Sequence, residues 1–224
     1  MIKYISKYNL VARIRKIFVR KKIEYEKNFY NRIAFLNKAI SKYDHNIVKY
    51  LEIGVDKNLV FNSIPIPIAN KIGIDPIQGG THRMKSRDFF KKNCDKFDVI
   101  FIDGDHNYEQ VRNDFIESLK ILNPKGIIFL HDVLPCSELE QTIPQKIDIW
   151  TGDVWKLILE LIENSKTLEI YIANIDCGVC MIKPKDNVIF GNTINYKNLS
   201  YEDFIERLYK KANILKSEDF IQKI

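Results

Sequence analysis

The residues best suited to chemistry follow directly on an apolar run at residues 99–102. They are two carboxylates and an imidazole around a glycine, namely Asp103, Gly104, Asp105 and His106. A second apolar run, at residues 127–130, also ends in polar groups, His131 and Asp132. Because buried carboxylates need a cation or a bound polar ligand to offset their desolvation, these groups predict a binding site.

The runs that carry these groups have the length and composition of strands that are buried on both faces. The first run continues into residues 108–122, where Val111, Phe115 and Leu119 recur at helical spacing. A strand that leads into a helix is typical of a parallel α/β sheet, and ligands of such sheets bind at the carboxyl ends of the strands. We therefore expect both polar clusters at one edge of one sheet.

Two earlier strands, at residues 48–55 and 71–76, bring more groups to that edge. The first contains Glu52 and Gly54, and a glycine there lets a ligand approach the backbone closely. The second ends in Asp75, which is placed to accept hydrogen bonds from a ribose. The G-x-G-x-x-G pattern that holds a pyrophosphate is missing, which argues against a dinucleotide. These strand ends predict a site for an adenosine-containing ligand.

The remaining segments predict how the sheet is completed. A short edge strand is expected at residues 81–84, a turn at 123–126 and a long loop at 133–152. A helix then begins at Asp153. Strands at residues 168–175 and 179–182 are joined so tightly that they must form an antiparallel hairpin. A capping-box-like sequence at residues 200–203 predicts a last helix that ends at Lys211.

Residues 1–45 are expected to form an N-terminal helical extension, ahead of one α/β domain at residues 46–224. Apolar residues at helical spacing predict two helices in the extension: Val11, Ile14 and Phe18 in the first, and Phe29, Ile33, Leu36 and Ile40 in the second. The extension could be a cap, a lid over the site or an oligomer contact, and we expect a homo-oligomer. Residues 1–22 contain eight basic residues and no acid, so they could also contact an anionic membrane surface.

The charge distribution argues against nucleic acid as the main partner. The net charge is +6, and residues 1–22 account for it, so the rest of the chain carries about −2. A dedicated nucleic-acid-binding protein usually presents a basic face on its folded domain. The sequence shows neither a transmembrane stretch nor a signal peptide, so we expect a cytoplasmic protein.

Six motifs between residues 48 and 183 resemble those of class I S-adenosylmethionine-dependent methyltransferases. In order they are Leu-Glu-Ile-Gly-Val, Ile-Gly-Ile-Asp-Pro, Phe-Asp-Val-Ile-Phe-Ile-Asp-Gly-Asp-His-Asn-Tyr-Glu-Gln-Val, Leu-Asn-Pro-Lys-Gly, His-Asp and Gly-Asp-Val-Trp-Lys. More narrowly, the chain resembles the methyltransferase domain 24 branch, which includes sugar O-methyltransferases of macrolide and polysaccharide pathways. The resemblance implies an α/β, Rossmann-like methyltransferase fold. Its mostly parallel seven-stranded sheet would end in an antiparallel hairpin, with the N-terminal helices added.

The resemblance also implies roles for single residues. The cofactor-binding positions match Glu52, Gly54, Asp75 for the ribose, Ser86 near the adenine, and Asp103. His106 matches a general base, and Asp103 lies with it at the catalytic centre. A divalent ion, Mg²⁺ or Mn²⁺, would be held by Asp103, His131 and Asp132. Because His131 stands where several members have an acidic ligand, the set suits Mn²⁺ better than Mg²⁺.

Together these observations predict an enzyme, an S-adenosylmethionine-dependent O-methyltransferase. Its substrate would be a sugar hydroxyl, on a nucleotide sugar or in a polysaccharide pathway. His106 would remove the hydroxyl proton as the oxygen attacks the sulfonium methyl, and a metal would lower the pKa of that hydroxyl. Two alternatives stay open: a methyltransferase for another small-molecule hydroxyl, an amine or a carboxylate, and a non-catalytic subunit that binds an adenosine ligand.

Overall fold

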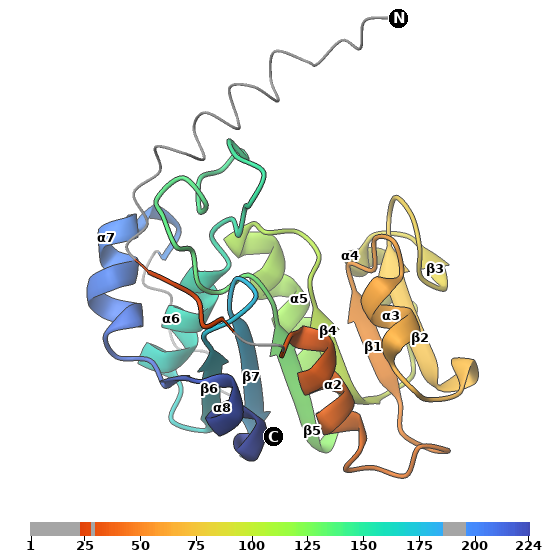
Figure 1. Cartoon of the computed structure of the whole chain (residues 1–224). Coiled ribbons are helices and arrows are strands. Elements are labelled where there is room, and N and C mark those ends of the chain that lie inside the picture. Colours follow the sequence, from red (N-terminus) through yellow and green to blue (C-terminus); the bar gives the residue numbers. More distant parts are fainter. Residues whose placement is uncertain (1–22, 28–29, 186–195) are drawn as a thin grey trace, which may run out of the picture.

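The computed structural model describes residues 23–27, 30–185 and 196–224. In these residues eight strands form one sheet, in the order β3-β2-β1-β4-β5-β7-β6-β8 (Figure 1). Their bounds are β1 (Tyr50–Ile53), β2 (Lys71–Asp75), β3 (His82–Arg83), β4 (Phe97–Ile102), β5 (Leu122–Leu130), β6 (Leu168–Ala173), β7 (Val179–Pro184) and β8 (Ile214–Leu215). Strand β7 is antiparallel to both of its neighbours, and all other pairs are parallel.

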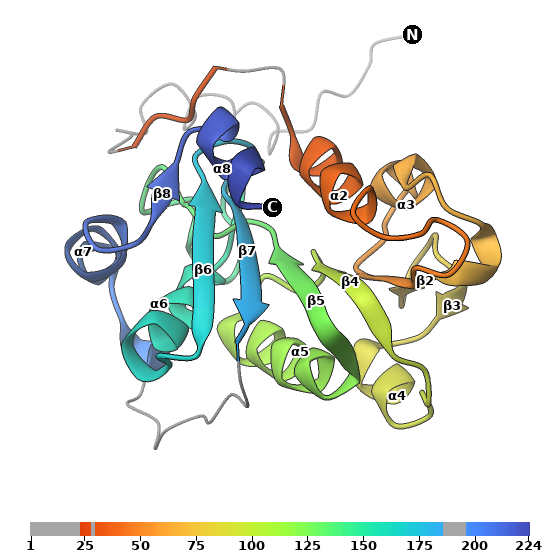
Figure 2. The same ribbon diagram turned by 90° about the horizontal axis from the view of Figure 1, so that it is seen from below.

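Helices cover both faces of the sheet. Figure 2 shows α2 (Arg32–Ile40), α3 (Leu59–Ser63) and α8 (Ser217–Lys223) on one face, and α4 (Ser86–Phe90), α5 (Tyr108–Ile121) and α6 (Trp155–Asn164) on the other. The shorter helical segments are η1 (Ile68–Asn70), η2 (Tyr196–Asn198), α7 (Tyr201–Asp203) and the π-helix η3 (Phe204–Tyr209). This three-layer arrangement buries the central strands, such as β1 and β4, on both sides.

Successive residues of β4 alternate between the two hydrophobic cores. Ile100 packs in the core that includes Phe115 of α5, whereas Phe101 packs in the core that includes Phe35 of α2. Both strand residues are completely buried, and each contributes about 1.5–3 kcal/mol by leaving water. The prediction that this strand is buried on both faces is confirmed. Its rigid packing fixes the position of the polar groups that follow it.

The predicted fold class is confirmed, with one correction. The sheet is mostly parallel and contains the predicted antiparallel pair β6–β7. The described part of the chain has eight strands instead of seven, so the predicted strand number is wrong. The additional strand is β8, which pairs with β6 at the sheet edge. It has two residues, too few to show the alternation by which a strand is recognised in a sequence.

Two boundaries also differ from the prediction. The turn expected at residues 123–126 lies inside β5, where it forms an irregularity. There Phe97 pairs with Leu122 and Val99 already pairs with Ile127. The capping box at Ser200 is confirmed, but the helix that it starts continues as the π-helix η3 and ends before Lys211.

The second helix predicted in the N-terminal extension is present as α2. It begins after Asn31, whose side chain accepts a hydrogen bond from the N–H of Ala34. Its buried side chains are those of Phe35, Leu36, Ala39 and Ile40. The first predicted helix, Phe29 of the second and the basic residues 1–22 with their predicted membrane contact lie outside the described residues. Within the described residues, no helix is both long and apolar enough to cross a membrane.

Candidate active site

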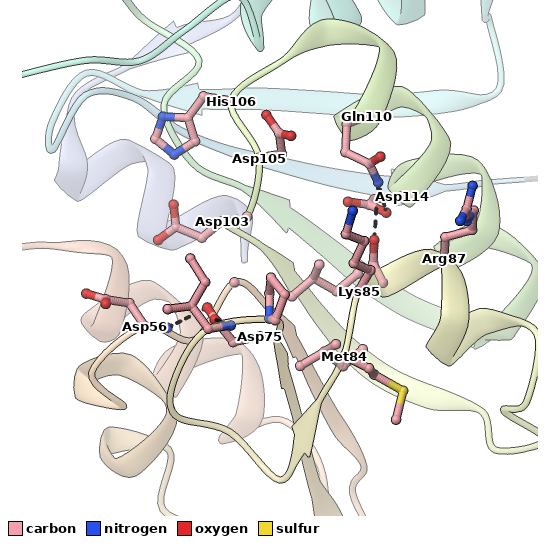
Figure 3. A pocket seen from close by; sticks show the side chains of 17 residues that line it. Asp56, Asp75, Met84, Lys85, Arg87, Asp103, Asp105, His106, Gln110 and Asp114 are labelled. Atoms are coloured by element: carbon pink, nitrogen blue, oxygen red, sulfur yellow. Dashed lines mark hydrogen bonds between the residues drawn. The ribbon is translucent and has the colours of Figure 1, made fainter. Parts of the chain in front are cut away.

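A cavity of about 600 Å³ opens where β1, β2 and β4 end (Figure 3). Its volume lies within the range of about 300–1,000 Å³ that is usual for small-molecule sites. The acidic side chains among its described lining residues are Asp56, Asp75, Asp103, Asp105 and Asp114, and the basic ones are Lys85 and Arg87. The excess of carboxylates favours a ligand that carries positive charge.

Asp75 lies at the end of β2, where backbone groups orient its carboxylate. Oδ1 accepts hydrogen bonds from the N–H groups of Ile77 and Gln78 at 2.7 and 3.0 Å, and Oδ2 accepts one from Asp56 at 3.0 Å. Burial raises the pKa of Asp75, but these three donors outweigh it and lower the pKa overall. A carboxylate has about four acceptor positions, so Asp75 can still accept a bond from a ligand hydroxyl.

Of the two site residues predicted at the end of β1, one lines the cavity and the other does not. Gly54 lines the cavity, in a left-handed conformation with φ +88°. Glu52 is only 1% exposed and does not line the cavity. Its carboxyl group accepts a hydrogen bond from the Tyr50 hydroxyl at 2.6 Å. Burial raises the pKa of Glu52 to about 8, although this hydrogen bond opposes the shift. The structure therefore brings Gly54, but not Glu52, to the cavity wall.

Ser86 lines the cavity within a polar cluster that extends to α5. Gln110 donates from Nε2 both to the Ser86 hydroxyl at 3.2 Å and to Asp114 at 3.0 Å. Burial raises the pKa of Asp114 to about 6. Sequence reasoning missed Gln110 and Asp114. One signal was present: Asp114 lies three residues after Val111 and directly before Phe115, so it shares the buried face of its helix.

His106 lies at the other end of the cavity, held on both ring nitrogens. Nε2 lies 3.1 Å from Oδ2 of Asp132, and Nδ1 lies 3.1 Å from the carbonyl oxygen of Trp150. The ring also stacks on the Trp150 indole, with centroids 4.9 Å apart. The N–H of Asp153 donates to the His106 carbonyl at 3.0 Å. The long loop at residues 133–152 thus positions this imidazole, which lines the same cavity as Asp75.

The three predicted metal ligands do come together. One ligand atom each from Asp103, His131 and Asp132 lie within 4.8 Å of one another. The Nδ1 atom of His131 is 3.1 Å from a carboxylate oxygen of both aspartates. The carboxyl ends of β4 and β5 therefore lie side by side, as expected, because the two strands are parallel neighbours.

The hydrogen bonding of His131 does not fit a metal ligand, however. Its Nε2 lies 2.6 Å from the backbone carbonyl oxygen of Asp176, which can only accept, and 3.1 Å from Nη1 of Arg32, which can only donate. Its Nδ1 faces two carboxylates and donates to them. Burial lowers the pKa of His131, but the adjacent Asp132 and Asp103 raise it well above the usual value. A cation at this site would have to displace Arg32 from Nε2, or the proton that Nδ1 donates to the two aspartates.

Arg32, the first residue of α2, is a further member of this site that sequence reasoning missed. Its Nη1 donates to Asp176 at 2.8 Å, and its Nε lies 3.7 Å from Oδ2 of Asp103. Nothing in the local sequence links Arg32 to these acids, because the contact depends on how α2 packs on the sheet. The cluster at the ends of β4 and β5 therefore already contains a permanent cation.

Comparisons with known proteins give one family match and several similar folds. Residues 74–133, about a quarter of the chain, match the family described as a methyltransferase domain (Methyltransf_24). Curated proteins yielded no significant sequence match.

Two solved structures are similar in fold. A Staphylococcus aureus protein with a provisional assignment as a caffeoyl-CoA O-methyltransferase has 14% identity and a TM-score of 0.52, over 80% of this chain and 92% of that chain. An O-methyltransferase of Bacillus cereus in complex with SAH has 14% identity and a TM-score of 0.51, over 80% and 89%. At such identities the likeness shows the fold alone. The chain therefore has the fold of these O-methyltransferases and contains, at residues 74–133, a match to a methyltransferase domain.

Proposed function

We propose that the protein is an O-methyltransferase that transfers the methyl group of S-adenosylmethionine to a sugar hydroxyl. The acceptor would be a nucleotide sugar or a sugar unit of a polysaccharide pathway, as the sequence motifs indicate. One observation carries the proposal: the ribose-type carboxylate Asp75 and the imidazole His106 line the same cavity. A cofactor bound through Asp75 and a base that serves the acceptor would then share one space.

The cofactor half of the proposal is supported by the charge of the cavity. S-adenosylmethionine carries a positive sulfonium and a positive amino group, and both favour a wall rich in aspartates. Ribose hydroxyls can donate to Asp75, whose carboxylate is already oriented by three backbone donors. The similar fold of the Bacillus cereus O-methyltransferase, solved with SAH, supports the same ligand class.

The proposed role of His106 as the general base is supported by the groups around its ring. The Trp150 carbonyl can only accept, so it keeps the proton of the neutral ring on Nδ1, and Nε2 is the nitrogen that takes a proton once the acceptor hydroxyl comes between it and Asp132. The hydroxyl proton moves to Nε2 while the oxygen forms its bond to the methyl carbon, and Asp132 stabilises the imidazolium that results. The carbon–sulfur bond breaks in the same step and leaves neutral S-adenosylhomocysteine. Alignment of oxygen, carbon and sulfur supplies much of the remaining rate.

Mg²⁺ or Mn²⁺, which the sequence resemblance implies, does not enter this mechanism. A divalent ion would polarise the acceptor hydroxyl if it were bound by Asp103 and Asp132. The donor set does not fit, because the guanidinium of Arg32 already lies beside both Asp103 and His131. The proton transfer is therefore assigned to His106 alone.

Calorimetry with S-adenosylhomocysteine, followed by a transfer screen, tests the proposal. The full chain should bind the ligand with one-to-one stoichiometry, and Asp75→Asn should weaken binding about 10-fold or more by removing a charged hydrogen bond. With labelled S-adenosylmethionine, nucleotide sugars should be methylated faster than aromatic diols, amines or carboxylates. Absence of binding would refute the function itself, whereas transfer to another acceptor would refute only the sugar.

A further inference from the structure

The polar cluster at the ends of β4 and β5 is bridged by an arginine. Arg32 reaches it from the start of α2 and donates through Nη1 to Asp176 at 2.8 Å. The backbone N–H of Arg32 lies 3.4 Å from the same oxygen. On its other side, Nε lies 3.7 Å from Oδ2 of Asp103. The guanidinium is thus fixed between a carboxylate of the β6–β7 connection and the cavity-lining carboxylate of β4.

The guanidinium of Arg32 occupies the position that a divalent ion would need in order to bind Asp103. Arg32 Nη1 also lies 3.1 Å from Nε2 of His131, so the guanidinium contacts two of the three predicted metal ligands. A divalent ion bound by Asp103 would lie within ion-pair distance of this guanidinium, and like charges at that distance repel strongly in a half-buried site. The arginine cannot lose its charge to relieve that repulsion.

Arg32 also has a hydrogen-bond donor that lacks an acceptor within the described part of the chain. Its Nε is buried and has no hydrogen-bond partner among the described residues, since Asp103 at 3.7 Å is an ion-pair contact and too distant for a hydrogen bond. A buried donor without an acceptor is rare in folded proteins. An oxygen atom that binds beside Asp103 would satisfy it.

We infer that Arg32 takes, at the end of β4, the place that a divalent ion takes in metal-dependent enzymes, so that methyl transfer by this protein is independent of metal. Arg32 is a positioning residue: it holds the Asp103 carboxylate against the cavity and balances its charge. The inference rests on the proposed methyltransferase function, but its test measures cation binding in the absence of cofactor and acceptor.

Calorimetric titration of the chelator-treated full chain with Mn²⁺ or Mg²⁺ gives the decisive measurement. The wild type should show no stoichiometric binding of either ion. Arg32→Met frees Asp103 and Asp176 and should bind Mn²⁺ at least about 10-fold more tightly than the wild type. The matched control is Arg207→Met, because Arg207 also pairs with two acids, Glu163 at 2.8 Å and Asp203 at 3.6 Å, outside the cluster. This control should bind Mn²⁺ as weakly as the wild type.

Two outcomes overturn the inference. One is stoichiometric binding of Mn²⁺ or Mg²⁺ by the wild type that Asp103→Asn abolishes. The other is a folded Arg32→Met variant with no more affinity for Mn²⁺ than Arg207→Met. If Arg32→Met does not fold, the wild type decides alone: no cation binding, together with transfer that survives excess chelator, supports the inference. Binding of S-adenosylhomocysteine is measured separately, so failure of the proposed function is distinguishable from failure here.

Discussion

Gly54 and Asp103 lie so close that a Cβ atom at position 54 would be 2.2 Å from the carbonyl oxygen of Asp103. The glycine also has φ +88°, a conformation that side chains rarely adopt. Only glycine lets the ends of β1 and β4 meet in this way. The wall of the cavity between Asp75 and His106 depends on this contact.

Gly54→Ala should therefore destabilise the protein and impair cofactor binding. The backbone conformation alone costs about 1–3 kcal/mol for a residue with a side chain, and the clash with Asp103 adds to it. Urea unfolding measures the loss. Gly104→Ala is the matched control, because a Cβ there would have its nearest neighbours at 3.6 Å, an ordinary contact. Equal stability of the two variants would contradict the steric reasoning.

His106→Ala should bind S-adenosylhomocysteine as the wild type does but lose about 10²–10⁴-fold in turnover, the usual contribution of a general base. Single-turnover methyl transfer and calorimetry separate the two effects. His45→Ala, which alters an exposed histidine, should leave both unchanged. Activity of His106→Ala close to that of the wild type would show that another group takes the proton.

Gly152→Ala should reduce turnover without changing the affinity for S-adenosylhomocysteine. A Cβ at this position, where φ is +57°, would be 2.0 Å from the His106 carbonyl oxygen and must displace that residue. A displacement of about 1 Å at a catalytic group can cost about 10²-fold in rate. Gly126→Ala serves as the control for a steric clash elsewhere, because a Cβ there would lie 2.7 Å from the Leu122 side chain and 2.9 Å from the Asn123 carbonyl oxygen, and none of its nearest neighbours belongs to the site. Wild-type turnover in Gly152→Ala would mean that the loop does not set the position of His106.

Glu52 should make stability depend on pH. Burial raises its pKa from 4.5 to about 8 in the folded state, so between these values the folded state binds the proton more tightly than the unfolded state. The free energy of unfolding should then fall as pH rises through this window, by up to about 1.4 kcal/mol per pH unit. Glu52→Gln removes the dependence and should gain stability relative to the wild type from pH 5 to pH 8.

Urea unfolding at several pH values measures this difference. Glu117→Gln, which alters an exposed ion pair with Lys120, should shift the whole profile by less than about 1 kcal/mol. Parallel profiles of the wild type and Glu52→Gln would show that the carboxyl group is ionised in the folded state.

The central strands and their polar ends were predictable because their signals are local. The apolar run before Asp103 and the run before His131 each specify a buried strand, and parallel strands deliver their carboxyl ends to one edge. The same signals predict that Asp103, His131 and Asp132 lie together, as they do in the structure. The sequence did not reveal the hydrogen bonding of the His131 ring, which depends on the carbonyl oxygen of Asp176.

What could not be predicted depends on packing between distant segments. Arg32 meets Asp176 across 144 positions of the chain, and no periodicity relates the two. Strand β8 is defined only by its pairing with Ile172 and Ala173. Glu52 was placed at the cofactor by motif, yet its side chain lies behind the cavity wall with Tyr50. A motif fixes the position of a residue along a strand, but only the packed structure fixes the direction of its side chain.

Backbone hydrogen bonds hold the long loop before α6 at both of its ends. At its start Leu134 donates to the carbonyl of Cys177 at 2.9 Å, and at its end Thr151 and Asp153 donate to Glu140 and His106 at 2.9 and 3.0 Å. Within the loop, Thr142 accepts a hydrogen bond from the Trp150 indole, and Gln141 accepts one from the Trp155 indole. The residues that hold neither indole, at positions 143–149, can therefore be exchanged while His106 keeps its place.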